Sequence, residues 1–154
     1  MFVKTTNGQL DQYPYTVGNL RRDNPNTSFP KRPSNEMLAE WGMQPVTKTD
    51  RPDVDHTKNV TEGTPVLNGD AWTQVWEVTD ATVEEIAQRT EDQSRFVRNK
   101  RDELLNETDW VVIKSNETGK PLSAAWKTYR QDLRDITTQQ GFPYDITWPT
   151  KPQV

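Results

Sequence analysis

The clearest pattern of hydrophobic positions is a helical stripe in the last third of the chain. Large side chains recur there at intervals of three and four residues, which places them on one face of a helix. They are Leu122, Trp126, Tyr129, Leu133 and Ile136. Pro121 suits the first helical position, and Gly141 and Pro143 predict the end of the helix. Beyond it, large and small residues alternate from Phe142 to Trp148, which predicts an extended strap lying back across the stripe.

A longer helix is predicted before this stripe. Thr82 and Glu85 match the capping box, in which two side chains satisfy free backbone N–H groups at a helix start. A seam at helical spacing follows, formed by Val83, Ile86, Thr90, Gln93, Val97, Lys100 and Leu104. Two interpretations fit this seam: an amphipathic helix packed on an N-terminal β module, or a contact between copies of the chain. The sequence Thr-Asp-Trp at 108–110 predicts the helix end, and residues 111–113 are predicted to form a short extended link.

The first eighty residues have the pattern of short strands joined by tight turns. Asn7-Gly8 supplies the positive φ angles of a two-residue turn and predicts an N-terminal hairpin. Asn68-Gly69 repeats this signal and predicts a second hairpin, followed by a strand over Ala71–Val78. Trp72 and Trp76 lie on one face of that strand, so we expect it to be buried on that side.

Irregular segments separate these strands. Asn19–Pro33 contains three prolines and is predicted to be an arm or loop without regular helix. Ser34 can cap a short helix over Asn35–Trp41, and Pro45–Lys48 is predicted to be a short strand. Thr49–Gly63 is almost entirely polar, which predicts a solvated linker or long loop.

Together these elements predict an α+β protein made of two small modules. A β-hairpin-rich N-terminal module covers residues 1–80, with residues 49–63 as its loop or linker. The long helix and a helical, tryptophan-rich module cover residues 81–154. Hydrophobic residues make up only 31% of the chain, so we expect small modules centred on the six tryptophans rather than one large core.

Charge and cysteine content narrow the classes of partner. The net charge is −4 with both signs interspersed, which disfavours nucleic acid and anionic membranes as partners. Cysteine is absent, which excludes disulfides and thiolate metal sites. No apolar run has the length of a membrane span, and Met1–Leu20 lacks the apolar core of a signal peptide. We therefore expect a protein made and kept in a cytosol.

Candidate catalytic chemistry is sparse. His56 is the single histidine, and its polar neighbours predict a solvated loop residue rather than a general base. Asp53, Asp55, His56 and Glu62 could offer oxygen ligands to a cation, but they lack the spacing of a calcium-binding loop. Carboxylate pairs on the predicted helices lie on solvated faces. The sequence therefore predicts a protein that is not an enzyme and has no catalytic, cofactor or metal site.

Three stretches of the last third form a recognisable series. They are RNKRDELLNETDW at 98–110, WKTYRQDLRDITTQQGFP at 126–143 and ITWPTKP at 146–152. In this order they strongly resemble the phage tail assembly chaperone family. The family pattern is an arginine-led helix ending at Thr-Asp-Trp, a turn, a Trp-x-x-Tyr-Arg-Gln-x-Leu-Arg-Asp helix, and closing Phe-Pro and Trp-Pro pairs. Residues 13–30 also resemble the N-terminal part of phage proteins that carry this module.

The resemblance implies a protein of a tailed bacteriophage with no enzymatic activity. It would bind a tail or tail-fibre subunit and assist tail or fibre assembly in the host cytoplasm. The alternative is a permanent structural component of the virion tail, such as a fibre, baseplate or neck adaptor or decoration protein. Because fibre assemblies are typically threefold, the resemblance also suggests a homo-oligomer, with a trimer as the expected form.

Partner binding is predicted to use aromatic and arginine residues of this last third. The candidates are Arg98, Arg101, Trp110, Trp126, Tyr129, Arg130, Arg134, Phe142 and Trp148. Two interpretations fit them. The aromatic side chains could close into a core between two helices and the strap, or part of the cluster could stay open as a groove with arginines at its rim, the composition of binding hot spots.

Overall fold

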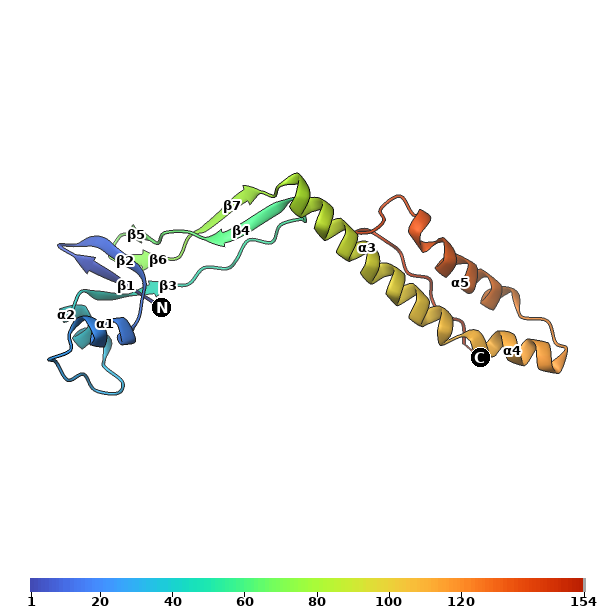
Figure 1. Ribbon diagram of the computed structural model, residues 1–154, viewed down its shortest axis with the longest axis horizontal. Helices are drawn as coiled ribbons and strands as arrows, with labels where there is room; N and C mark the ends of the chain where they lie inside the picture. The colour runs from blue at the N-terminus through green and yellow to red at the C-terminus, as the bar shows by residue number, and fades with distance from the viewer. Residues whose placement is uncertain (154) are drawn as a thin grey trace. The chain divides into compact units, whose positions relative to one another are not determined.

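The computed structural model describes residues 1–153 and divides the chain into two compact units. Unit 1 comprises Met1–Ala81, and unit 2 begins at Thr82. In the described residues, unit 1 contains the strands and two short helices, whereas unit 2 is helical (Figure 1). The predicted α+β class is therefore confirmed. Independent folding of the two units stays a prediction.

Unit 1 is built around a mixed sheet. Its elements are β1 (Phe2–Thr6), β2 (Gln9–Tyr15), α1 (Val17–Asp23), α2 (Asn35–Glu40), β3 (Met43–Thr47), β4 (Lys58–Glu62), β5 (Val66–Asn68), β6 (Ala71–Thr73) and β7 (Trp76–Asp80). One sheet has the strand order β2-β1-β3-β6-β5, and β4 pairs with β7 in a separate ribbon. The β3–β6 pairing is parallel and the others are antiparallel.

Both predicted hairpins are confirmed. Asn7 and Gly8 have φ angles of 54° and 78° in the turn between β1 and β2. Gly69, with φ 61°, lies in the turn between β5 and β6. The first turn thus uses the whole Asn-Gly pair, whereas in the second turn Asn68 ends β5 and pairs with Ala71, so Gly69 and Asp70 form the loop.

The strand predicted over Ala71–Val78 is wrong as a single strand. The chain leaves the sheet after β6, and the buried Gln74 side chain accepts a hydrogen bond from the Thr49 N–H (3.2 Å) and donates one to Glu62 (2.7 Å). The second half of the segment is β7, which pairs with β4 inside the predicted linker 49–63. The alternating pattern indicates that the segment is extended, but it does not indicate where the segment stops pairing with one strand and begins to pair with another.

A helix also occurs where the sequence predicted only loop. In α1 the Thr16 side chain caps the helix by accepting from the Asn19 N–H at 3.1 Å, and Leu20 is buried. The prolines that predicted a loop begin at Pro25, beyond the end of α1, so they do not prevent the helix. The short helix α2 is confirmed, with the Ser34 side chain accepting from the Met37 N–H.

The core of unit 1 consists of two small clusters. One contains Tyr15, Leu20, Leu38 and Met43, and the other contains Val3, Val46 and Trp72. Gly42 is essential between β1 and β3: its φ is 73°, and a Cβ there would lie 2.5 Å from the Thr5 carbonyl oxygen. Only glycine fits this close approach without moving β1.

Unit 2 is a set of helices followed by the strap. The elements are α3 (Val83–Asn106), α4 (Asp109–Thr118), α5 (Ala124–Arg134) and the 3₁₀-helix η1 (Asp135–Thr138). Both hydrogen bonds of the predicted capping box between Thr82 and Glu85 are present. No helix within residues 1–153 is both long and apolar enough to cross a membrane.

Four of the five residues of the predicted stripe form the buried face of α5 and η1, whereas Leu122 lies in the loop before α5 and is only partly buried. Trp126, Tyr129, Leu133 and Ile136 are buried. The predicted start is wrong, because Ser123 caps the helix and Pro121 lies in the loop before it. The helical region ends at Thr138, three residues before Gly141.

The long helix α3 uses its apolar residues inside unit 2. Val97 is buried, and α3 packs against α5 within unit 2 (Figure 1). Packing of α3 on the β module stays a prediction. A contact between copies through the same seam stays a prediction, and Val83 at its start is 78% exposed.

The extended link predicted at 111–113 is wrong, since these residues lie in α4. Val111 is buried, and Gly119 ends the helix in the left-handed conformation, with φ 67°. A run of three apolar residues is too short for periodicity to separate helix from strand. The side of the helix that faces the core is set by packing against α5, which the sequence pattern did not reveal.

Candidate functional site

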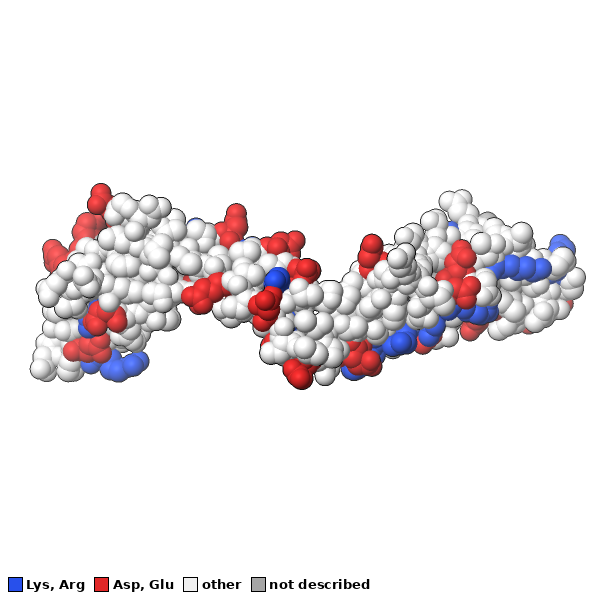
Figure 2. All heavy atoms as spheres, turned by 90° about the horizontal axis from the view of Figure 1, so that it is seen from above, with Lys and Arg blue, Asp and Glu red and all other residues white. Residues whose placement is uncertain are grey.

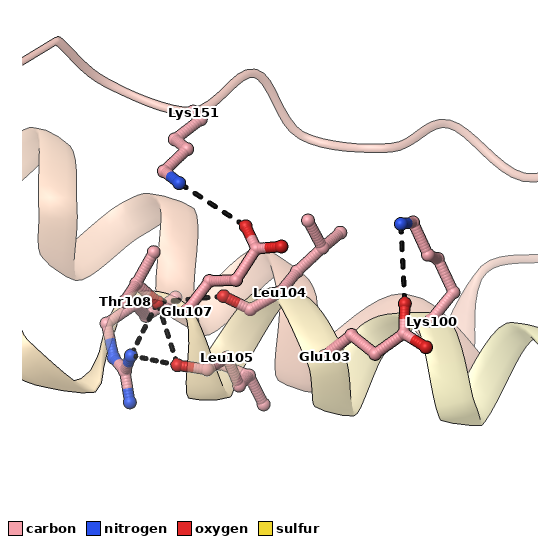
Figure 3. Close-up of polar contacts among 8 residues, drawn as sticks. Lys100, Glu103, Leu104, Leu105, Glu107, Thr108 and Lys151 are labelled. Carbon is pink, nitrogen blue, oxygen red and sulfur yellow. Dashed lines mark hydrogen bonds and ion pairs between the residues drawn. The ribbon is translucent and has the colours of Figure 1, made fainter.

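A buried arginine fixes the junction between α3 and α4 to α5. The guanidinium of Arg130 donates to the Leu105 carbonyl (2.8 Å) and to the Thr108 hydroxyl oxygen (2.6 Å), and it forms an ion pair with Asp109 (2.7 Å). Thr108 is fully buried, and its hydroxyl lies 2.9 Å and 3.0 Å from the carbonyl oxygens of Leu104 and Leu105 (Figure 3). The planar fork of arginine suits these several acceptors, so one side chain sets the direction of α4.

An aromatic cluster fills the space between these helices. Its buried members are Val111, Trp126, Tyr129 and Leu133, and Leu104, Leu105, Val112, Leu122 and Trp148 pack against them. Trp126 and Tyr129 meet edge to face with ring centroids 5.8 Å apart, an arrangement favoured by their quadrupoles. The structure therefore places Trp126, Tyr129 and Trp148 in the core of unit 2.

Polar contacts close the segment 139–153, which contains the predicted strap, on itself and join its end to the end of α3. The Gln139 side chain bonds both the N–H (2.8 Å) and the carbonyl (2.9 Å) of Thr147, and Lys151 pairs with Glu107 of the α3 end at 3.4 Å (Figure 3). The first part is a turn rather than the predicted extended chain, because the Tyr144 and Asp145 N–H groups both donate to the Gly141 carbonyl.

The predicted arginine rim is only partly present. Arg130 lies inside the unit, which contradicts its expected place at a rim. Arg98 is exposed with its guanidinium 5.4 Å from the Phe142 ring, and Arg134 is exposed beside the Arg130 carbonyl. Arg101 is half-buried and pairs with the neighbouring Asp102. Phe142 thus contacts Arg98 and is not a member of the aromatic cluster that contains Trp126.

Trp110 differs from the other predicted aromatic residues. Its side chain is 43% exposed, and the Lys114 ammonium lies 5.7 Å from its ring. It lines a shallow groove of about 190 Å³ between α4 and the start of α5. The lining residues are Trp110, Val111, Lys114, Ser115, Thr118, Lys120, Pro121, Leu122, Ser123 and Trp126. An open groove beside the core therefore exists, but lysines rather than arginines flank it.

A second hollow, of about 620 Å³, lies in unit 1 and was not predicted from the sequence. Its lining includes Asp11, Tyr13, Glu62 and Glu77. The Tyr13 hydroxyl donates to the Glu62 carboxylate. Burial, reinforced by this hydrogen bond, raises the pKa of Tyr13 to about 12, and hydrogen bonds from Tyr13 and Gln74 lower the pKa of Glu62. The three carboxylates come from β2, β4 and β7 and line one hollow only in the folded unit. No local sequence motif could therefore predict this hollow.

The residues first considered for metal or base chemistry have local roles. The Asp55 carboxylate accepts from the Thr57 N–H (2.8 Å) and hydroxyl (2.5 Å), which lowers the pKa of Asp55. Glu62 instead bonds Tyr13 and Gln74. Within residues 1–153, no three His, Cys, Asp or Glu side chains come together in a way that could hold a metal ion.

Comparison with known proteins gives one result that bears on function. Neither the curated proteins nor the solved structures give a significant match to the chain. Residues 94–153, from the middle of α3 through the strap, match a family described as phage tail assembly chaperone protein. This range contains α4, α5, the buried Arg130 and the groove. Over these residues, fewer than half of the chain, the C-terminal part is thus similar to the phage tail assembly chaperone family, and this similarity indicates a role in phage tail assembly.

Proposed function

We propose that the protein binds a tail or tail-fibre subunit through unit 2 and assists the assembly of the tail or its fibre. The observation that carries this proposal is that the family match coincides with a compact set of helices that leaves one apolar groove open. A binding role needs such a surface, because interaction energy concentrates in a few aromatic or charged anchors.

The different roles of the three residues in the Thr-Asp-Trp sequence support the groove as the binding surface. Thr108 and Asp109 are both engaged by Arg130, and their bonds fix the first turn of α4. Trp110, the next residue, makes no such internal bond and stays 43% exposed on the fixed turn. A half-exposed tryptophan on a fixed backbone turn is a favourable anchor, because binding energy concentrates in such aromatic residues and the turn needs no reordering when a partner covers it.

Co-purification with structural proteins of the same phage tests the proposal. The full chain, carrying an affinity tag, is co-expressed with each tail and tail-fibre subunit, and the bound and soluble amounts of the subunit are measured. We expect Trp110→Ala to lose most of the bound subunit while keeping the melting temperature. Ile113→Ala is the matched control, because Ile113 is an apolar residue of the same helix, 55% exposed, outside the groove lining.

Analysis of purified virions separates the two forms of this function. A transient chaperone leaves after assembly, so the protein is then absent from particles in stoichiometric amount. A permanent tail component is present in a fixed ratio to the other tail proteins. Quantitative mass spectrometry of particles measures this ratio, and failure of every tail and fibre subunit to bind the chain would refute the proposed function.

A further inference from the structure

We propose that the groove between α4 and α5 binds a short acidic segment of the partner subunit that carries a large apolar side chain. The inference rests on the proposed function and specifies its ligand. The apolar side chain would lie against Trp110 and Trp126, and the flanking carboxylates would pair with Lys114 and Lys120.

The dimensions of the groove suit a peptide side chain. Its volume of about 190 Å³ is below the ~300–1,000 Å³ typical of pockets for drug-sized ligands and cofactors. Its apolar surface comes from Trp110, Val111, Leu122 and Trp126, and the last three belong to the aromatic cluster or pack against it. An inserted apolar side chain would remove this surface from water, which is the main favourable contribution to such binding.

The charge around the groove selects acidic neighbours for that side chain. Residues 110–129 contain three lysines, Lys114, Lys120 and Lys127, against one acid, Glu117, a local charge of +2 in a chain of net charge −4. Lys114 and Lys120 line the groove itself, whereas no acidic residue does. Lys and Arg also form a band along one face of unit 2 (Figure 2). Complementary charge of this kind orients a partner and disfavours segments of the wrong sign.

An acidic peptide is a better fit than a nucleic acid. A nucleic acid needs a continuous run of cations along its phosphate backbone. Here Glu117 lies on the same helix as Lys114, and acidic side chains border the basic band in Figure 2. A few carboxylates beside one apolar residue match the two lysines that line the groove together with its apolar side chains.

A synthetic peptide tests the chemistry on the full chain. The probe is a short capped peptide with glutamates flanking one phenylalanine. Its two controls replace the glutamates by glutamine or the phenylalanine by serine. Binding is followed by the indole N–H signals of the six tryptophans in nuclear magnetic resonance spectra, with the Trp110 signal identified by Trp110→Phe. We expect the acidic peptide to shift the Trp110 signal and each control peptide to bind more weakly.

Variants of the chain separate the apolar and the charged contributions to peptide binding. We expect Trp110→Ala to abolish measurable binding and K114Q/K120Q to weaken it about three- to tenfold, the loss expected for two exposed ion pairs. High salt should reduce the difference between the wild-type chain and K114Q/K120Q. Lys127→Gln and Ile113→Ala are controls outside the groove lining, and both should bind as the wild-type chain does.

Each result has a distinct meaning. Equal binding of the glutamate and glutamine peptides would overturn the acidic ligand. If Trp110→Ala retained the co-purified tail subunit, the groove would be excluded while the assembly role stood. If the Trp110 signal moved only with the concentration of the chain itself, the groove would be a contact between copies and the proposal would be wrong. Binding of an unstructured oligonucleotide in preference to the peptide would overturn it as well.

Discussion

The two units of this protein are stabilised by different kinds of contact. In unit 1, β3 pairs with both β1 and β6, and β4 pairs with β7, so backbone hydrogen bonds join segments that are far apart in sequence. In unit 2, α3 packs against α5, and one arginine and one aromatic cluster connect α3, α4 and α5. Segments of unit 2 are therefore joined mainly by side chains, whereas those of unit 1 are joined mainly by strand pairing.

The two units also differ in their relation to the family match. The family match begins at residue 94 and includes only residues of unit 2. There Thr108, Asp109 and Arg130 are used to hold the helices, which leaves Trp110 at the surface. Unit 1 also has a partly exposed tryptophan, Trp41 at 37%, whose ring meets Phe29 edge to face, and the lining of its large hollow includes the acids Asp11, Glu62 and Glu77. In unit 2 the bonds of Arg130 hold the backbone turn that carries the half-exposed Trp110.

Removing a core leucine from unit 2 should have the largest effect. Leu133 is fully buried in the aromatic cluster, and Leu133→Ala should lower the stability of unit 2 by about 2–5 kcal/mol, because it leaves a cavity among rigid rings. Chemical denaturation followed by resolved amide signals measures each unit separately. We expect the signals of unit 1 to keep their midpoint.

Leu67→Ala in unit 1 is the matched control, since the Leu67 side chain is 50% exposed and the loss should stay within about 0.5 kcal/mol. Equal destabilisation of both units by Leu133→Ala would show that they unfold as one body and would remove the basis for treating them as independent.

Local sequence signals predicted local structure well. The stripe from Trp126 to Ile136, the capping box at Thr82 and the two Asn-Gly turns each follow from residues only a few positions apart. For the same reason the site was only half predicted. Trp110 and Trp126 were recognised as candidates, but which of them is exposed depends on how α4 packs against α5.

The remaining errors arise where distant groups decide the outcome. Gln74 interrupts the predicted strand because its side chain finds Thr49 and Glu62, residues that no pattern within the strand indicates. Arg130 was expected at a surface because arginine is rarely buried. Its burial is explained by three acceptors supplied by the end of α3 and the start of α4.

Two glycines with the same backbone conformation, one in each unit, provide a second test of how the two units differ. Gly42 in unit 1 and Gly119 in unit 2 have φ of 73° and 67°, but a Cβ at Gly42 would clash with the Thr5 backbone, whereas none would be contacted at Gly119. Gly42→Ala should therefore destabilise unit 1 by about 2–4 kcal/mol, the sum of the left-handed penalty and the movement of β1. Gly119→Ala should lower the stability of unit 2 by only about 1–2 kcal/mol.

Thermal unfolding monitored for each unit compares the two variants. Both variants place alanine in a left-handed conformation, so this backbone penalty is common to them. The difference between their stability losses therefore measures the cost of the clash between a Cβ at residue 42 and β1. Equal losses would show that this approach relaxes freely and that the pairing of unit 1 is less rigid than the structure indicates.

Replacing the buried arginine tests the local junction of unit 2. Arg130→Met keeps much of the apolar bulk but leaves the Thr108 hydroxyl and the Leu105 carbonyl without their donor. We expect a loss of about 1–3 kcal/mol, with Asp109 rehydrated because it is more than half exposed. Arg130→Lys should recover little, since one ammonium cannot reach these acceptors as a fork.

Arg134→Met, four residues further along α5, is the control, because Arg134 is exposed and contacts only the Arg130 carbonyl at 3.4 Å. Calorimetry of the three variants gives the comparison. Full stability of Arg130→Lys would mean that charge rather than geometry holds α4 in place, and Trp110 would then be less firmly positioned than we infer.

The smallest expected effect is a dependence of unit 1 on acid. The Tyr15 hydroxyl donates to Asp23 at 2.6 Å, and this bond, with Lys4 nearby, lowers the pKa of Asp23 below its ordinary value. Since the folded pKa is the lower one, the ionised carboxylate stabilises unit 1 at neutral pH, and that stabilisation is lost as pH falls below about 4 through the folded pKa.

Tyr15→Phe should bring the pKa of Asp23 closer to its ordinary value and make unit 1 less sensitive to acid between about pH 5 and pH 2. The carboxyl carbon shift of Asp23 measures the pKa directly, and the melting temperature of unit 1 measures its consequence. An unchanged titration in Tyr15→Phe would show that Lys4 alone depresses the pKa of Asp23. The acid sensitivity of unit 1 would then come from an exposed ion pair and should disappear in high salt, whereas the Tyr15 hydrogen bond, between groups of which one is buried, should persist.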